Sequence, residues 1–205
     1  SRINSGADDA AGLALADGLA ANEAALTQSA QNAQNGVGML QTADGALAQV
    51  TNLLTRAVTL ATEASNSTLN AAQLTAADTE FQSIVTEIGN IGTSTNFNGN
   101  AVYSATAANI VTTDGTTTGT TAFAPVVGVL TNASIGGTAV TLGSDVLTSN
   151  ASAATALTDI TAAIAAVAAQ RGTLGASINQ LNAASNVAST EQVNLSAAES
   201  NIRST

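Results

Sequence analysis

The 205-residue chain contains no cysteine, no histidine, no tryptophan and one proline. Without cysteine and histidine there are no disulfides, no thiolate nucleophiles, no zinc sites of the usual kind and no histidine general base. Aromatic residues make up 2% of the chain although hydrophobic residues make up 45%. The aromatic residues are Phe81, Phe97, Tyr103 and Phe123. A composition this rich in small aliphatic residues suits closely packed helices better than a deep globular core.

Positive charge is also scarce. Lysine plus arginine number 4 against 14 aspartate plus glutamate, for a net charge of −10. Binding to nucleic acid or to an anionic membrane surface requires a basic patch, so we expect neither as a partner. No uninterrupted apolar run approaches the ~20 residues that span a bilayer. The first residues also lack the basic start and apolar core of a signal peptide.

The first third of the chain repeats an apolar residue every seven positions. The series is Leu19, Leu26, Ala33, Leu40, Leu47, Leu54 and Ala61. A heptad pattern sustained this long predicts one helix over 10–66 that packs against others, and small residues three positions further on allow close approach. A second apolar stripe over 74–91 predicts an antiparallel helical hairpin. Gly89 and Gly92 are expected to mark the end of this second helix.

The composition changes to Thr, Gly, Ser and Val over 93–150 and then returns to helical periodicity. An Asp-Gly pair within 112–117 and a Gly-Gly pair within 135–137 predict β-hairpins. The predicted fold class is therefore mainly α: a long antiparallel helical bundle or coiled-coil rod of three helices with a small β-hairpin-rich insertion. We expect an N-terminal helical hairpin over 1–96, the β-rich insertion over 97–150 and a long C-terminal helix over 151–205.

Two adjacent carboxylates, Asp8 and Asp9, precede the first helix. Neighbouring side chains on a helix point ~100° apart, so this pair cannot converge on one proton or one metal ion. We expect instead that Ser5 or Asp8 caps the helix and that the charges favour its N-terminus. No cofactor is expected. Calcium bound through oxygen ligands near Asp114 or Asp145 stays open, although no EF-hand spacing is present.

Arg171 interrupts the apolar stripe of the last helix at a position that should face the core. Either its charged end reaches outward while its stem covers neighbouring apolar residues, or it forms an ion pair that sets helix register. Arg56 is the only cation between Arg2 and Arg171 and suits contact with a partner.

Several motifs resemble those of the bacterial flagellins. They are RINSGADDAAGLA from position 2, LTQSAQNAQNGVGMLQTADGAL from position 26, NFNG at 96–99, QRGTLGASINQL at 170–181 and NLSAAESNIRST at 194–205. The resemblance implies a structural subunit of the extracellular flagellar filament, secreted and self-assembling for motility, with no enzymatic activity. It also implies flagellar cap and hook-filament junction proteins as partners. The chain resembles a trimmed core, expected to be monomeric, with terminal assembly and export segments outside it.

The same resemblance bears on particular residues. It implies that Asp8 and Asp9 belong to an assembly signature, with contacts to backbone donors or to arginines such as Arg2 and Arg203. Flagellins are also ligands of Toll-like receptor 5, and the matching positions are Arg56, Leu60 and Glu80. Val58 and Thr59 depart from the charged family residues, so weakened recognition is expected.

Two other functions stay open. A hook-filament junction protein shares the terminal helices, although the full Asp-Asp-Ala-Ala-Gly signature favours a flagellin. A cell-surface adhesin could instead bind polysaccharide through the Thr-rich insertion. Tyr103 and Phe123 would be its scarce platforms for stacking sugars. With no histidine and no converging acid pair, an enzyme is not expected.

Overall fold

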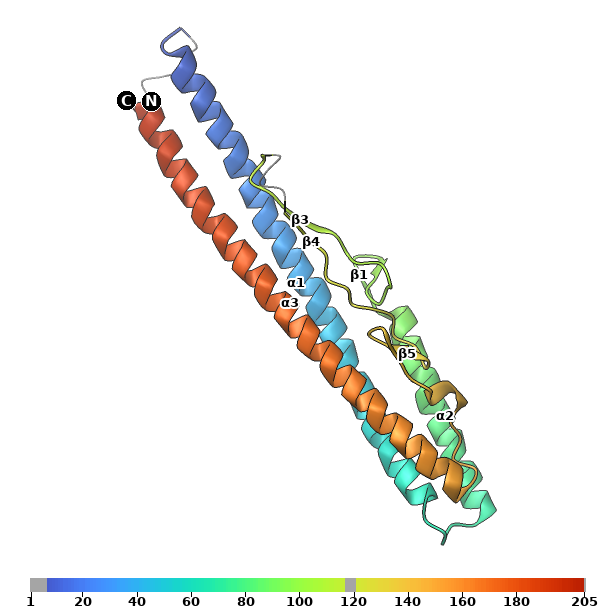
Figure 1. Cartoon of the computed structure of the whole chain (residues 1–205). Coiled ribbons are helices and arrows are strands. Elements are labelled where there is room, and N and C mark those ends of the chain that lie inside the picture. The colour runs from blue at the N-terminus through green and yellow to red at the C-terminus, as the bar shows by residue number, and fades with distance from the viewer. Residues whose placement is uncertain (1–6, 117–120, 205) are drawn as a thin grey trace. The chain divides into compact units, whose positions relative to one another are not determined.

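The computed structural model describes residues 7–116 and 121–204. Three helices dominate: α1 (Ala10–Ala64), α2 (Ala71–Ser94) and α3 (Asn150–Ser204). Between α2 and α3 lie three separate two-stranded antiparallel sheets and a short 3-10 helix, η1 (Leu142–Ser144). The strands pair as β1 (Asn96–Phe97) with β2 (Asn100–Ala101), β3 (Ile110–Thr112) with β4 (Thr121–Phe123), and β5 (Ser134–Ile135) with β6 (Thr138–Ala139). The predicted mainly α fold with a small β insertion is confirmed (Figure 1).

The chain forms two compact units, each built from segments far apart in sequence. Among the described residues, unit 1 draws on Ser1–Gly38, Ala108–Pro125 and Ser177–Thr205, and unit 2 on Met39–Ala107 and Val126–Ala176. The first half of α1 and the second half of α3 therefore belong to unit 1. The remaining halves of these helices pack with α2 in unit 2.

The heptad positions of α1 form the buried stripe of the helix. Leu26, Ala33, Leu40, Leu47, Leu54 and Ala61 are all buried. Leu19, the first position of the series, is only half-buried. The small residues beside the stripe, such as Ala43 and Ala57, are also buried, so the interface of α1 alternates leucine with alanine.

Unit 2 has the larger core. Phe81 and Ile88 of α2 are fully buried together with Ile160 and Leu174 of α3. A capping box starts α2, because Asn70 and Gln73 each accept a hydrogen bond from the other's backbone N–H. At the start of α3, the side-chain amide of Asn150 donates to the carbonyl oxygens of Ala64 at 2.8 Å and Asn66 at 2.9 Å, which ties this helix to the end of α1.

The predicted end of α2 was wrong. Gly89 and Gly92 lie inside the helix, which continues to Ser94. Gly92 does not end the helix but allows a close contact: a Cβ atom added to it would lie 1.9 Å from the carbonyl oxygen of Leu130. The residue without a side chain lets the insertion backbone lie directly against α2.

Positive backbone φ angles close two of the hairpins. Asn98 and Gly99, between β1 and β2, have φ angles of 51° and 79°. Gly136 and Gly137, between β5 and β6, have φ angles of 59° and 88°. Positive φ at both central residues is the geometry of two-residue hairpin turns, which glycine and asparagine favour. The predicted Asp-Gly hairpin also exists: β3 and β4 pair antiparallel, and Asp114 and Gly115 follow β3.

In unit 1, α1 and α3 run antiparallel. The carboxylate of Asp17 contacts the guanidinium of Arg203, and further along Gly36 faces the side chain of Leu181. A Cβ atom on Gly36 would also lie 2.4 Å from the end of the Ile110 side chain, so β3 sits tightly against α1 here.

By length and composition alone, α3 contains an 18-residue window apolar enough to cross a membrane, with a mean hydropathy of 1.5. A third of that window is buried inside the protein, and a packed helix of this composition passes the same test. The absence of a membrane partner stays a prediction.

Candidate interaction sites

Asp9 caps α1. Its Oδ1 accepts hydrogen bonds from the backbone N–H groups of Ala11 at 3.1 Å and Gly12 at 3.0 Å. The cap was therefore expected one or more residues too early, at Ser5 or Asp8. Asp8 lies in the exposed turn before the helix, and Ser5 lies outside the described residues. At Asp9 the side chain reaches the free N–H groups of the first turn.

The expected contact between the Asp8–Asp9 signature and arginines concerns Arg2 and Arg203. Arg2 lies outside the described residues. Arg203 donates from Nε to Glu199 of its own helix at 2.7 Å and contacts Asp17 of α1 at 3.3 Å. Asp9 accepts hydrogen bonds from backbone donors, the N–H groups of Ala11 and Gly12.

Arg171 forms an ion pair across the α1–α3 interface of unit 2. Its partner is Asp44, with Nε 2.7 Å from Oδ1. The side chains of Arg171 and Asp44 are 40% and 36% exposed. The hydrogen bond and the charge of Asp44 raise the pKa of Arg171. Of the two interpretations of this position, the structure shows the ion pair, and it lies at the edge of the interface where water still reaches it.

Arg56 of α1 and Glu80 of α2 form a second ion pair in unit 2. Nε lies 2.6 Å from Oε1 and Nη2 lies 2.9 Å from Oε2, so both carboxylate oxygens are used. The hydrogen bond to Arg56, with its positive charge, lowers the pKa of Glu80, and the same pairing raises the pKa of Arg56. Both side chains remain about half exposed, which leaves them accessible to a partner.

Leu60, the third residue of the expected receptor patch, lies one turn further along α1. It is only 3% exposed and belongs to the unit 2 core. The structure therefore brings Arg56 and Glu80 together at the surface but places Leu60 beneath it.

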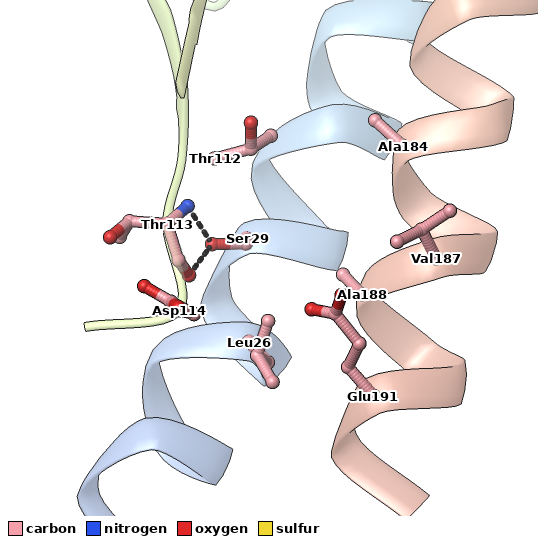
Figure 2. Close-up of a pocket in the computed structure, with 9 residues that line it drawn as sticks. All are labelled: Leu26, Ser29, Thr112, Thr113, Asp114, Ala184, Val187, Ala188 and Glu191. Carbon is pink, nitrogen blue, oxygen red and sulfur yellow. Dashed lines mark hydrogen bonds between the residues drawn. The ribbon is translucent and has the colours of Figure 1, made fainter. Parts of the chain in front are cut away.

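A groove of about 320 Å³ lies in unit 1 between α1, α3 and the β3–β4 hairpin. Figure 2 shows Leu26 of α1 and Ala188 of α3 facing one another, with the carboxylate of Glu191 close by. The hairpin is attached by Ser29, whose hydroxyl donates to the carbonyl of Thr113 at 2.6 Å and accepts from its N–H at 2.7 Å (Figure 2). The lining contains no basic residue, so the groove does not suit an anionic ligand.

Four large apolar side chains are exposed among the described residues of unit 1: Leu15 is 57% exposed, Val111 is 37% exposed, Val187 is 57% exposed and Val193 is 67% exposed. The heptad analysis did not single them out, because it follows the buried stripe and not the outward face. Val187 also lines the groove. Apolar side chains on a thin helix pair are available for packing against another chain.

The proposed sugar platforms and calcium sites can be compared with their surroundings. Tyr103 is buried, and its hydroxyl donates to the carbonyl of Ala43 at 2.6 Å. Burial, with the charge of Asp44, raises the pKa of this hydroxyl. Tyr103 therefore presents no ring face for sugar stacking. The Asp114 carboxylate accepts hydrogen bonds from Thr116, and within residues 7–116 and 121–204 no group of three or more metal-ligating side chains occurs.

Comparison with known proteins identifies the family. The model of the bacterial flagellin N-terminal helical region matches residues 1–108, and that of the C-terminal helical region matches residues 157–205. The chain belongs to the bacterial flagellin family. Flagellins are non-enzymatic structural proteins of the extracellular bacterial flagellum, in agreement with the predicted class and location.

Individual flagellins show how much of the family the chain spans. It is 38% identical over 115 residues to flagellin 1 of Proteus mirabilis, covering 56% of this chain and 32% of that protein. It is 42% identical over 97 residues to a flagellin of Halalkalibacterium halodurans, covering 47% of this chain and 36% of that protein. The chain thus spans about a third of the length of these flagellins. The crystal structure of Bacillus cereus flagellin superimposes with a TM-score of 0.61 at 28% identity, covering 77% of this chain and 88% of that one.

Proposed function

We propose that this chain is the helical core of a flagellar filament subunit and that it acts by self-assembly. The observation that carries the proposal is the match of both flagellin helical regions to the two ends of the chain, where α1 and α3 pack antiparallel. No reaction is needed for this function. The chemistry lies in burying helix faces, at ~25 cal/mol per Å2 of apolar surface removed from water.

The exposed apolar residues of unit 1 support the proposal. Val187 and Val193 lie on α3, and in the described part of unit 1 the elements beside this helix are α1 and the β3–β4 hairpin. Burying a valine or leucine side chain completely contributes ~1.5–3 kcal/mol. We therefore assign this face of α3 to contacts between subunits, while the pairs Arg171–Asp44 and Arg56–Glu80 act within one subunit.

Electron microscopy of the full-length protein, purified from the cells that produce it, tests the proposal. We expect filaments from the full-length chain, and a monomer in light scattering from the segment 1–205 alone. Val187→Asp and Val193→Asp should prevent filament growth, because each would bury an unpaired charge. The controls are Val187→Thr and Val193→Thr, which keep the branched shape of each side chain and introduce no charge. Filament growth by both aspartate variants would count against the assignment of this face.

The same protein would contact the flagellar cap and the hook-filament junction proteins at the ends of the filament. A junction protein is the alternative identity from the same lineage. Copy number in purified filaments separates the two, because a filament subunit accounts for nearly all the protein and a junction protein for a small fraction.

A second candidate function is recognition by Toll-like receptor 5, for which Arg56 and Glu80 would form the contact. Their support is geometric: a planar guanidinium and a carboxylate from two helices meet at an exposed position. Burial of Leu60 agrees with weakened recognition, because that side chain offers no surface area to the receptor.

A reporter-cell assay for the receptor tests this second candidate. Arg56→Ala should lower the response, whereas Thr55→Ala, the exposed neighbour, should not. Circular dichroism of both variants controls for unfolding. Equal responses from Arg56→Ala and the parent chain would refute the assignment.

A further inference from the structure

The turn between β1 and β2 consists of Asn98 and Gly99 and closely follows α2 (Figure 1). Both residues are exposed, and a Cβ atom added to Gly99 would meet nothing within 4 Å. In an asparagine followed by glycine, the side-chain carboxamide is readily attacked by the next backbone nitrogen, because glycine has no side chain to block the approach. The turn therefore combines a reactive dipeptide with open surroundings.

A second Asn-Gly pair in the same chain provides a comparison. The sequence contains two such pairs, and the other one is Asn35-Gly36. These two residues lie inside α1, where each backbone N–H is held by the carbonyl four residues earlier. Gly36 is buried, and a Cβ atom added to it would lie 2.4 Å from the end of the Ile110 side chain. The same dipeptide thus occurs once in a packed helix and once in an exposed turn.

One peptide rotation separates the observed turn from the geometry that the reaction needs. The φ angles of 51° at Asn98 and 79° at Gly99 are those of a type I′ turn. A type II′ turn also has a positive first φ, and the two types differ by a flip of the central peptide. This peptide lies outside the strand ladder, whose last pair is Phe97 with Asn100, and glycine accepts either sign of φ. The flip turns the nitrogen of Gly99 towards Cγ of Asn98.

We propose that Asn98-Gly99 is a site of spontaneous deamidation, with water as the co-reactant. The backbone nitrogen of Gly99 loses its proton to base and attacks Cγ of Asn98. An N–Cγ bond forms, the bond from Cγ to the amide nitrogen breaks, and ammonia leaves with a proton from water. Water then opens the five-membered succinimide ring at either carbonyl carbon. One opening gives aspartate at position 98 and the other gives isoaspartate.

The two products affect the hairpin differently. Aspartate at position 98 keeps the turn, since Asp-Gly also suits type I′, and adds one negative charge to a chain whose net charge is −10. In isoaspartate the main chain runs through the side-chain carboxyl, which adds one methylene to the turn. The connection then no longer fits the pairing of Phe97 with Asn100. The hydrogen bond from the Val102 N–H to the Thr95 carbonyl, 3.1 Å across the base of the hairpin, should weaken with it.

Peptide mapping of the incubated chain tests the proposal. A protease that cleaves before aspartate separates the two pairs, because peptide 78–113 contains Asn98 and peptide 17–43 contains Asn35. The chain is held at mildly alkaline pH, folded or in urea, and conversion of amide to carboxyl is followed by mass. We expect similar rates at both sites in urea. In the folded chain Asn98 should react at least ~tenfold faster than Asn35, because the helix must open locally before Asn35 can react.

Asn98→Gln is the matched variant, because its longer side chain would have to close a six-membered ring. Reaction in peptide 78–113 should stop, while reaction in peptide 17–43 stays unchanged. Equal rates at Asn98 and Asn35 in the folded chain would overturn the proposal, as would no reaction at Asn98 in either solvent.

Amide hydrogen exchange of Val102 tests the effect on the hairpin. The same protease cleaves before aspartate at position 98 but not before isoaspartate, so the two products can be told apart. Exchange should be faster in the isoaspartate fraction than in Asn98→Asp, which keeps the normal backbone. Equal protection of Val102 in both would overturn the expected loss of pairing.

Discussion

Arg171 of α3 and Asp44 of α1 are joined by two parallel hydrogen bonds in unit 2. Nε lies 2.7 Å from Oδ1 and Nη2 lies 3.2 Å from Oδ2. The planar guanidinium can meet both carboxylate oxygens only when the two helices are aligned along their length in one way. The arginine within the apolar stripe therefore sets the register of the interface. The other contacts there, mostly of alanine and leucine, are less specific for one alignment of the two helices.

Replacing Arg171 by alanine should destabilise unit 2 by about 1 kcal/mol, because the pair is half exposed and water screens much of its attraction. The loss includes packing of the arginine stem on neighbouring residues. Urea unfolding of the single variants Arg171→Ala and Asp44→Asn and of the double variant separates the pair interaction from the packing loss. Additive effects in this cycle would show that the pair itself contributes nothing.

Gly92→Ala should cost ~1–3 kcal/mol or more, because the new Cβ atom would lie 1.9 Å from the carbonyl oxygen of Leu130 and force the insertion away from α2. Gly89→Ala is the matched control in the same helix, since a Cβ atom there meets nothing within 4 Å. It should stabilise α2 by ~0.5–1 kcal/mol through helix propensity. Chemical denaturation compares the two. If both substitutions stabilise, the close approach at Gly92 is wrong.

Asp9→Ala should destabilise the N-terminal end of α1 by ~1 kcal/mol, because Ala11 and Gly12 lose their hydrogen-bond acceptor. Asp9→Asn keeps the side-chain oxygen and should retain most of the stability. Hydrogen exchange of the first-turn amides measures the effect where it occurs. Equal exchange rates in Asp9→Ala and Asp9→Asn would contradict the role of Asp9 as cap.

Ser29→Ala should loosen the β3–β4 hairpin from α1. Ser29 is 2% exposed, and its hydroxyl both donates to and accepts from the backbone of Thr113, so removing the hydroxyl should cost ~1–3 kcal/mol. Thr27→Ala is the control, because the hydroxyl of Thr27 bonds only within its own helix, to the carbonyl of Glu23. Limited proteolysis of the hairpin distinguishes them. Equal resistance in both variants would mean that other contacts hold the hairpin.

The helices were the part of the fold that the sequence predicted best. The series from Leu26 to Ala61 predicted the buried stripe, because a helix facing a neighbour along its whole length must repeat its apolar residues at the helical period. The Gly-Gly pair at 136–137 predicted a hairpin for a local reason as well: both residues adopt positive φ. The cap at Asp9 was missed by one position or more, which is the usual uncertainty at a helix end.

The geometry of the candidate site was harder to predict from the sequence. Arg56 and Glu80 were named from a resemblance, and their distance of 2.6 Å depends on how α1 and α2 pack. The burial of Leu60 and of Tyr103 could not be predicted from their neighbours in sequence, because burial depends on how segments distant in the chain pack together.

The sequence by itself determined the class of the protein, its helices and its flagellin family, because periodicity, composition and motif are properties of neighbouring residues. Only the tertiary structure decided that Gly92 gives room for Leu130, that Arg171 pairs with Asp44 and that Tyr103 donates to the carbonyl of Ala43. Each of these pairs joins residues far enough apart in sequence that no local pattern records it. Packing brings the members of each pair within a few ångströms, and the close approach, the ion pair and the hydrogen bond arise only there.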